Sequence, residues 1–217
     1  NVNNYHNIEY IVVENNSVLD ETFAGYETME KKYGDRFRLV RWDGGFNYSA
    51  INNYGIQYAK GEYILLLNND TEVIEPDSLR RMLAICQRSE VGIVGAKLLY
   101  DDNTVQHAGI VMGYQGVAGH AFTGIGDDVY GYFARAVLTQ ELSAVTAACL
   151  LTKRSVFEQV GKLDETFEVA FNDIDYCMKV REAGYQIIYE PHAKLHHYEY
   201  KSRGAEDTGR KQERFGG

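Results

Sequence analysis

One short stretch constrains the fold more than any other part of the sequence. Residues 63–67 are apolar at every position, and the polar residues Asn-Asn-Asp-Thr follow directly at 68–71. A strand that is apolar throughout suits the interior of a parallel sheet with both faces covered. Ligands of open α/β sheets bind beyond the carboxyl ends of such strands. The stretch therefore predicts a buried strand that holds Asp70 rigidly at a ligand-binding edge.

Strands and helices are predicted to alternate through the first half of the chain. Apolar runs at 8–13 and 37–42 indicate two further strands, and Gly34 and Gly61 end helical patterns. Asp20 is the predicted N-cap of the first helix. Such alternation implies βαβ units, hence an α/β fold with an open, mostly parallel central sheet flanked by helices. The expected helices are residues 19–33, 48–61 and 76–88.

The second half of the chain predicts a small antiparallel element. Residues 91–100 and 104–112 flank a polar turn and are expected to form a hairpin. Six glycines between 113 and 131 are typical of a mobile loop. Because there is no internal repeat and no linker, we expect one domain over residues 1–217. The remaining expected elements are a strand at 142–153, a helix at 173–183 ended by Gly184, and a short strand at 185–189 before Pro191.

The start of the sequence lacks an expected element. An open α/β domain normally begins with a strand that contributes to the ligand pocket, whereas residues 1–7 are mostly polar. These residues look like the end of a helix or the loop after it. We therefore expect the first strand of the fold to be missing from this sequence.

Composition narrows the possible functions. The chain has 217 residues, of which 45% are hydrophobic and 24% charged, which is ordinary for a folded domain. Its 31 acidic and 22 basic residues give a net charge of −9, which argues against a nucleic-acid-binding surface. A polyanionic ligand is compatible with this charge, because a divalent cation can bridge carboxylates to phosphates.

Cysteine usage and hydropathy indicate the compartment. Cys86, Cys149 and Cys177 are widely spaced in apolar surroundings and are expected to be reduced core residues, which favours the cytoplasm. No apolar run approaches the ~20 residues that cross a bilayer, and the sequence has no signal peptide. Peripheral association with the inner face of the cell membrane stays open.

Two polar segments that follow predicted strands are candidates for ligand contacts. Asp70 could ligate Mg²⁺ or Mn²⁺ and so hold a diphosphate, although the Asn-Asn-Asp-Thr turn could equally cap the next helix. Taken alone, these two interpretations of Asp70 are balanced. Glu14, Asn15 and Asn16 occupy the equivalent position after the strand at 8–13. They could contact a base or ribose, but taken alone they favour an Asx-turn.

Further candidate chemistry lies toward the end of the chain. Asp173 opens a predicted helix, where acidic residues are common, yet it follows the apolar residues 169–171 and could act as a general base. His192, His196 and His197 follow in a strand-end segment. A lone histidine is more often structural than a ligand, but a histidine pair in an acidic chain favours a metal ligand.

Short blocks spread over nearly the whole chain carry a resemblance to a known family. They lie at residues 11–17, 47–55, 61–71, 117–122, 143–150, 171–175, 181–185 and 202–204, and include Ile-Leu-Leu-Leu-Asn-Asn-Asp-Thr and Phe-Asn-Asp-Ile-Asp. Each block is weak alone, but their order and spacing are specific. The sequence resembles the family 2 glycosyltransferases, which have the GT-A fold. It is similar to bacterial enzymes that build O-antigen, rhamnan or similar surface polysaccharides, often as modules of longer proteins.

The resemblance implies a role for each matching position. Asp70 matches the last aspartate of the family's DXD-type metal motif, while Asn68 stands where many relatives carry aspartate. Asp173 matches the catalytic base, and His197 matches the histidine that completes the metal site. The departure at Asn68 leaves one carboxylate fewer for the cation.

Other matching positions imply contacts with the two substrates. Residues 1–100 would form the nucleotide-sugar half and residues 101–204 the acceptor half, followed by a tail at 205–217. The implied nucleotide contacts are Glu14, Asn16, Asn53, Asn69 and Asp70, and the implied acceptor contacts are His120 and Asp175.

The resemblance also implies an inverting reaction. Asp173 would deprotonate an acceptor hydroxyl as it attacks the anomeric carbon, while Mg²⁺ or Mn²⁺ held by Asp70 and His197 would stabilise the departing nucleoside diphosphate. The glycine-rich segment at 113–131 would order over the donor and exclude water. The expected donor is a UDP- or dTDP-type sugar, and the expected acceptor is a saccharide or a lipid-linked sugar.

Two rival functions are weighed against this one. A sugar-nucleotide pyrophosphorylase has a similar α/β core, but it gives Asp173 and His197 no role, and the sequence shows no glycine-rich loop of its type. A non-catalytic sugar-binding or nucleotide-binding module would be expected to lose the base or the metal ligands, and both are present.

Overall fold

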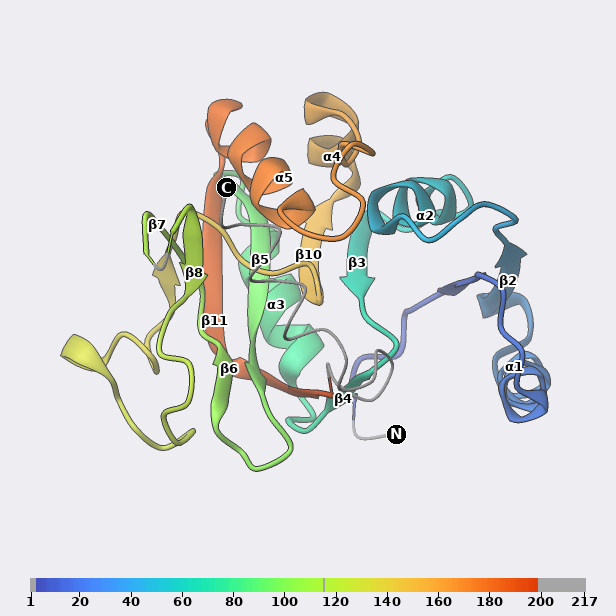
Figure 1. The fold of residues 1–217 in the computed structure, drawn as a ribbon, viewed down its shortest axis with the longest axis horizontal. Helices are drawn as coiled ribbons and strands as arrows, with labels where there is room; N and C mark the ends of the chain where they lie inside the picture. Colours follow the sequence, from blue (N-terminus) through green and yellow to red (C-terminus); the bar gives the residue numbers. More distant parts are fainter. Residues whose placement is uncertain (1–2, 115, 199–217) are drawn as a thin grey trace.

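Helices cover both faces of a central β-sheet in the computed structural model, which describes residues 3–114 and 116–198 (Figure 1). The tail predicted at 205–217 and the block at 202–204 lie outside these residues. The strands are β1 Tyr10–Glu14, β2 Phe37–Arg41, β3 Tyr63–Leu67, β4 Thr71–Val73, β5 Val91–Leu99, β6 Val105–His107, β7 Ile110–Met112, β8 Ala118–His120, β9 Gln140–Glu141, β10 Cys149–Lys153 and β11 Gln186–His197. The helices are α1 Asp20–Tyr33, α2 Tyr48–Ile56, α3 Ser78–Cys86, α4 Arg154–Val160 and α5 Asn172–Glu182.

The central sheet is mixed. Its strands lie in the order β3-β10-β5-β11-β4, with β6 paired to β5 and β9 paired to β11. β5 and β11 are parallel, and β10 is antiparallel to both β3 and β5, so β3, β5 and β11 run in one direction. β1 and β2 form a separate parallel pair, and β7 and β8 a small antiparallel one. The predicted α/β class and the small antiparallel element are confirmed.

Different helices pack on the two faces because successive strand residues point to opposite sides of a sheet. Val94 and Leu98 of β5 pack with Met82 and Cys86 of α3. Ile93 of the same strand packs instead with buried residues of α4 and α5. Figure 1 shows α3 and α5 on opposite faces of the sheet. All three cysteines are buried and form no disulfide, as the sequence predicts.

Several element boundaries differ from the prediction. α2 ends at Ile56 rather than near Gly61, because the backbone tightens into turns after it. Leu19, not Asp20, is the N-cap of α1, and Asp20 lies in the first turn. The strand expected at 142–153 begins only at Cys149, and β4 and α4 were not predicted. None of the helices in the described residues is long and apolar enough to cross a membrane.

β11 is longer than predicted. The expected strand ends before Pro191, but β11 continues through it to His197. Its pairing with β5 shifts register between Glu190 and Lys194, and Pro191 lies in this irregularity. A bulge tolerates proline because the missing backbone N–H is not needed for the ladder there. The extra length carries His197 to the far end of the sheet.

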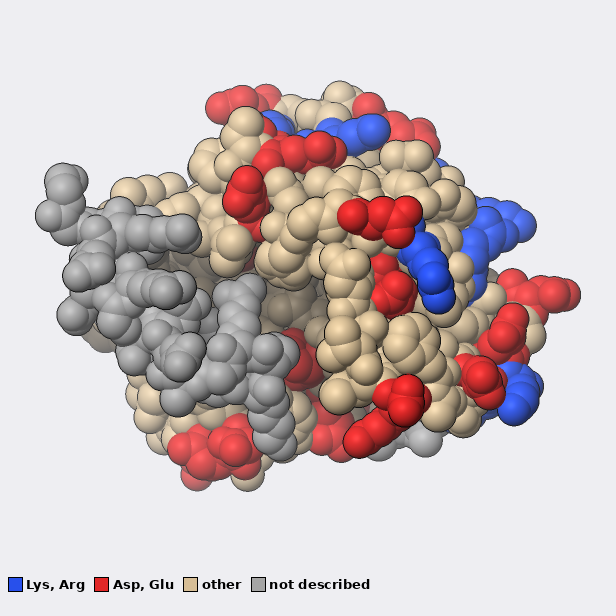
Figure 2. Space-filling view, turned by 45° about the vertical axis from the view of Figure 1, so that its right-hand side comes forward, with Lys and Arg blue, Asp and Glu red and all other residues tan. Residues whose placement is uncertain are grey.

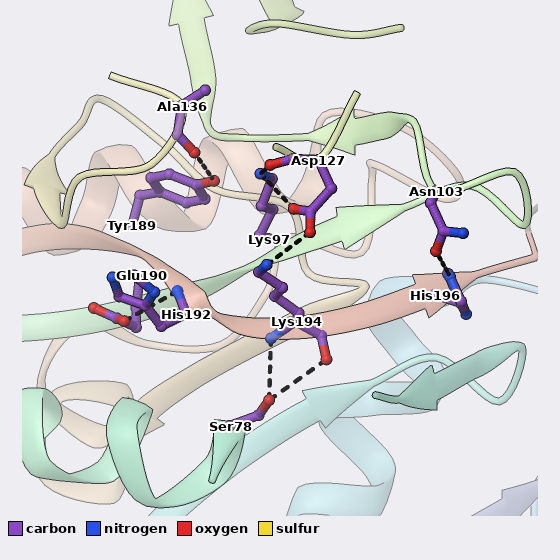
Figure 3. A network of polar contacts seen from close by, with 10 residues as sticks. All are labelled: Ser78, Lys97, Asn103, Asp127, Ala136, Tyr189, Glu190, His192, Lys194 and His196. Atoms are coloured by element: carbon purple, nitrogen blue, oxygen red, sulfur yellow. Dashed lines mark hydrogen bonds and ion pairs between the residues drawn. The ribbon is translucent and has the colours of Figure 1, made fainter. Parts of the chain in front are cut away.

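The described part of the glycine-rich segment at 113–131 contains more regular structure than the predicted loop. It contains β8, which pairs with β7, and it is tied to the sheet at Asp127 (Figure 3). Lys97 Nζ lies 2.7 Å from Asp127 Oδ1, and Lys194 Nζ lies 2.7 Å from Asp127 Oδ2. Lys97 is only 1% exposed and also donates to the backbone oxygen of Asp127 at 3.0 Å. Asp127 therefore anchors this segment to β5 and β11.

Asp127→Asn is expected to lower the free energy of unfolding by about 3–5 kcal/mol, because the buried charge of Lys97 loses its partner. Burial alone would raise the pKa of Asp127, but the contacts with Lys194 and Lys97 outweigh it and lower that pKa. The ionised carboxylate therefore stabilises the fold above its unfolded pKa, and this stabilisation is lost as the pH falls through its folded pKa. Urea denaturation at pH 7 measures the effect.

The neighbouring Asp128 provides the matched control, because it is exposed. Asp128→Asn should change the free energy of unfolding by less than about 0.5 kcal/mol, as is usual for surface substitutions. A small effect at both positions would show that the ion pairs of Asp127 do not stabilise the domain.

Candidate active site

The predicted turn after β3 is fixed at both ends. The backbone N–H of Asn68 donates to the oxygen of Ala148 at 3.0 Å, just before β10 begins. The Thr71 hydroxyl donates to the oxygen of Asn68 at 2.7 Å and closes the turn. Asn69 is exposed at its tip, and Asp70 is half-buried. The turn is therefore a rigid support for the Asp70 carboxylate.

β4 brings Asp70 next to His197. It pairs with the end of β11 so that Thr71 faces His197. Asp70 Oδ1 lies 3.2 Å from His197 Nε2, and the side-chain amide of Asn68 lies 3.2 Å from the same nitrogen. His197 is buried. The structure thus brings together the two residues that the resemblance implies as metal ligands.

Gln106 sets the orientation of the His197 ring. Gln106 Nε2 donates to the backbone oxygen of His197 at 3.3 Å, so Gln106 Oε1 faces His197 Nδ1, at 2.7 Å. An amide oxygen only accepts, so Nδ1 carries the hydrogen and the lone pair of the neutral ring lies on Nε2, facing Asp70.

This pair fits a hard divalent cation. The carboxylate oxygen suits Mg²⁺ or Mn²⁺, and the imidazole nitrogen beside it favours a transition metal such as Mn²⁺ over Mg²⁺. Such a cation usually takes its remaining ligands from substrate phosphates and water. Over residues 3–114 and 116–198, no group of three or more histidine, cysteine or acidic side chains gathers in a way that could hold a metal. The protein would therefore supply Asp70 and His197, and the substrate would complete the coordination.

Asp173 lies in the first turn of α5, which the chain enters through a left-handed residue, Phe171, with φ of 65°. Its carboxylate accepts from the next backbone N–H at 2.9 Å, from the N–H of Ala147 at 3.3 Å and from the hydroxyl of Thr146. Burial raises the pKa of Asp173, and these hydrogen bonds only partly offset it. A raised pKa makes the carboxylate a stronger base.

Residues 146–148 connect the two parts of the site. The first donates its N–H to His107 Nε2 at 3.3 Å, and the second donates its N–H to Asp173 Oδ2 at 3.3 Å. The third accepts from the N–H of Asn68 at 3.0 Å. The separation between Asp173 and the Asp70 turn is therefore set by one short stretch of backbone.

Sequence reasoning missed Gln106, His107 and Thr146. Gln106 and His107 are both buried in β6, and two successive polar residues inside the mostly apolar predicted strand 104–112 were the available signal. His107 Nδ1 lies 2.9 Å from Nδ1 of His120, which is exposed. The predicted acceptor residue His120 is thus connected through His107 and Thr146 to Asp173.

With this geometry in place, comparison with known proteins assigns the family. Residues 1–161 match the family model described as glycosyl transferase family 2. The chain belongs to this family. Protein y4gI of Sinorhizobium fredii is 49% identical over 97% of the chain. The O-antigen biosynthesis protein RfbC of Myxococcus xanthus is 39% identical over 93% of the chain. The family 2 domain spans 23% and 16% of the lengths of these two relatives.

A solved structure confirms the fold of the family 2 domain. The mannosyltransferase PcManGT from Pyrobaculum calidifontis, in complex with GDP-Man and Mn²⁺, superposes with a TM-score of 0.65. The match covers 94% of this chain and 51% of that protein, at 17% sequence identity. At this identity the likeness shows the fold, and the GT-A fold implied by the resemblance is confirmed.

The predicted nucleotide contacts of the family 2 domain lie in different settings. Glu14 is buried, and its Oε1 accepts from the N–H of Ser17 at 2.6 Å, which closes the turn after β1. Asn16 is exposed in the same turn, with φ of 57°. Asn53 is buried and donates to the oxygen of Leu163 at 2.8 Å and to Glu165 at 3.0 Å. Asn53 thus holds α2 against the loop before α5. Its contact with a nucleotide stays a prediction, which these protein contacts do not favour.

Asp175, the other predicted acceptor residue, is engaged in an ion pair within α5. Its carboxylate lies 2.6 Å from Lys179 Nζ, one turn further along α5. Such a pair within one helix is a common stabilising contact. Asp175 therefore has a structural partner, and its contact with an acceptor stays a prediction.

Proposed function

We propose that this domain is an inverting glycosyltransferase that moves a sugar from a nucleoside-diphosphate sugar to a hydroxyl of a saccharide or lipid-linked acceptor. The observation that carries the proposal is the connection of Asp173 to the Asp70–His197 pair through residues 146–148. Family membership supports the reaction class, and the name of the RfbC relative supports a place in surface-polysaccharide synthesis. We place the reaction in the cytoplasm, where a lipid-linked acceptor would be reached from the inner face of the membrane.

Asp70 and His197 would hold Mg²⁺ or Mn²⁺ for the donor. When bound, the cation supplies positive charge that neutralises the diphosphate. Figure 2 shows acidic side chains spread over the face drawn, in keeping with the net charge of −9. Such a cation would offset the repulsion between an acidic protein and a polyanionic donor. The proposed nucleotide contacts are Glu14, Asn16 and Asn69.

Asp173 would act as the base. Its carboxylate takes the proton of the acceptor hydroxyl while the hydroxyl oxygen forms a bond to the anomeric carbon. The bond from that carbon to the donor phosphate breaks in the same step, and its electron pair leaves with the nucleoside diphosphate. Attack from the side opposite the leaving group inverts the anomeric configuration. The fixed position of Asp173 on α5 keeps the base on the acceptor side.

A substrate panel tests the proposal. The protein is incubated with UDP-, dTDP- and GDP-sugars, Mn²⁺ and oligosaccharide or lipid-linked acceptors, and the release of nucleoside diphosphate is measured. We expect one donor to be consumed, only when the cation is present, and NMR of the product to show inversion at the anomeric carbon. Consumption that persists in EDTA, or a product with retained configuration, would contradict the proposed mechanism.

A further inference from the structure

The buried residue His107 is the centre of a hydrogen-bond chain that ends at His120. The backbone N–H of Thr146 donates to His107 Nε2 at 3.3 Å. On the other side of the ring, His107 Nδ1 lies 2.9 Å from His120 Nδ1. His107 has no exposed surface, whereas His120 is exposed. One histidine is therefore enclosed by protein and the other is presented to solvent.

The direction of the first bond fixes every proton in the chain. A backbone N–H can only donate, so His107 Nε2 must be the acceptor and carries no hydrogen. His107 then carries its proton on Nδ1 and donates it to His120 Nδ1. His120 must accept at Nδ1, which places its own proton on Nε2. Burial is the main cause that lowers the pKa of His107, which keeps that ring neutral.

The same backbone segment places this chain beside the proposed base. Thr146 donates its N–H to His107, and the next residue, Ala147, donates its N–H to Asp173. His120 lies within electrostatic reach of Asp173 as well. The Nε2–H of His120 is therefore a hydrogen-bond donor on the acceptor side of the site.

We propose that His107 is a positioning residue, which holds His120 in the Nε2–H tautomer so that His120 donates a hydrogen bond to an oxygen of the acceptor saccharide beside Asp173. The substrate in this inference rests on the proposed function, whereas the tautomers do not. With Nδ1 engaged and Nε2 protonated, His120 has no lone pair for the proton of the acceptor hydroxyl. His120 therefore binds the acceptor, and Asp173 remains the base.

NMR of the protein with ¹⁵N-labelled histidine tests the tautomers directly, without substrate. Long-range ¹H–¹⁵N spectra at neutral pH should show His107 protonated on Nδ1 and His120 protonated on Nε2, with the His120 signals assigned from His120→Gln. His120 protonated on Nδ1, or on both nitrogens, would overturn the proposal. This result stands even if His107 variants fail to fold or no glycosyl donor is ever found.

Kinetics then separate positioning from a merely structural role. His107→Phe keeps a ring but removes both hydrogen bonds, and should lower kcat/KM for the acceptor roughly 10–100-fold, as expected when a partner that orients a histidine is lost. The KM for the donor should not change. His107→Asn keeps a donor near the position of Nδ1 and should recover most of the activity.

His192 supplies the control for replacing histidine with phenylalanine, because its side chain is exposed. His192→Phe should leave both kinetic constants at the wild-type level. Equal losses in His107→Phe and His107→Asn, with the donor KM raised in both, would show that His107 only supports the fold. If the wild-type protein turns over no nucleotide sugar, the proposed function fails, and the NMR result alone decides the role of His107.

Discussion

Asp173→Asn is expected to lower kcat by about 10²–10⁴-fold, because the amide cannot take the proton of the acceptor hydroxyl. The substitution keeps the size of the side chain and removes only its basicity. Binding of the donor should be nearly unchanged, because the carboxylate contacts Ala147 and Thr146 and not the Asp70–His197 pair. Release of nucleoside diphosphate at saturating substrates gives kcat, and calorimetry gives donor affinity.

The same substitution should raise the melting temperature at neutral pH. Burial raises the pKa of Asp173 in the folded protein, so folding favours the neutral carboxyl group. Stability from such a group is fully present below its unfolded pKa and is lost as the pH rises through its folded pKa. Asparagine imitates the neutral form at every pH. The gain in melting temperature should therefore be largest at neutral pH and shrink as the pH falls below the pKa of Asp173.

Asp164→Asn is the matched control for both measurements. Asp164 is half-buried in the loop before α5, and its contacts with Thr166 can be kept by asparagine. It should change neither kcat nor the pH dependence of the melting temperature around neutral pH. Turnover by Asp173→Asn at the wild-type rate would remove Asp173 from the mechanism, and a lower melting temperature would mean that its ionised form stabilises the fold.

Asp70→Asn should abolish the cation-dependent stabilisation of the protein by nucleoside diphosphates. A ligand at 100 times its Kd stabilises a protein by about 2.7 kcal/mol. For a domain of this size, that corresponds to a rise in melting temperature of about 5–10 °C. The variant loses the only carboxylate of the proposed metal pair, so Mn²⁺ and nucleotide together should shift its melting temperature little. The wild-type protein in EDTA should behave in the same way.

Asp101 offers a comparison for this second substitution, because it is exposed in the turn between β5 and β6. Asp101→Asn should keep the full shift with Mn²⁺ and nucleotide. If Asp70→Asn also kept the full shift, the nucleotide would bind without the Asp70–His197 pair. In that case the cation site would have to be sought elsewhere, even if transferase activity were found.

The features that the sequence predicted best are those that depend on a short local pattern of residues. β3 and the Asp70 turn were expected because an unbroken apolar run and the polar residues after it are visible in a few positions. β11 was predicted too short because Pro191 normally ends a strand, and only the register of β5 shows that a bulge accommodates it. β4 was missed because three residues give no periodic signal, yet its pairing with β11 is what brings Asp70 to His197.

The residues of the candidate site also divide into those visible from the local sequence and those whose role depends on a distant partner. Asp70 and Asp173 became candidates by type and position, since each lies at the end of a strand or the start of a helix, whereas the family resemblance singled out His197 from three nearby histidines. Gln106 and His107 were not found, because a polar residue inside an apolar strand has meaning only when its partner is known. Both partners come from distant parts of the chain, at His197 and Thr146.

On the proposed function, the stretch 146–148 bears on how a family 2 domain could change its acceptor. Three consecutive residues span at most about 7 Å between their outer Cα atoms, so the backbone to which Asp173 and the Asp70 turn are hydrogen-bonded has a fixed length. The glycine-rich segment after β8 makes neither of these two hydrogen bonds. On the proposed function, that segment could differ between acceptors while the spacing between the two hydrogen bonds stays constant.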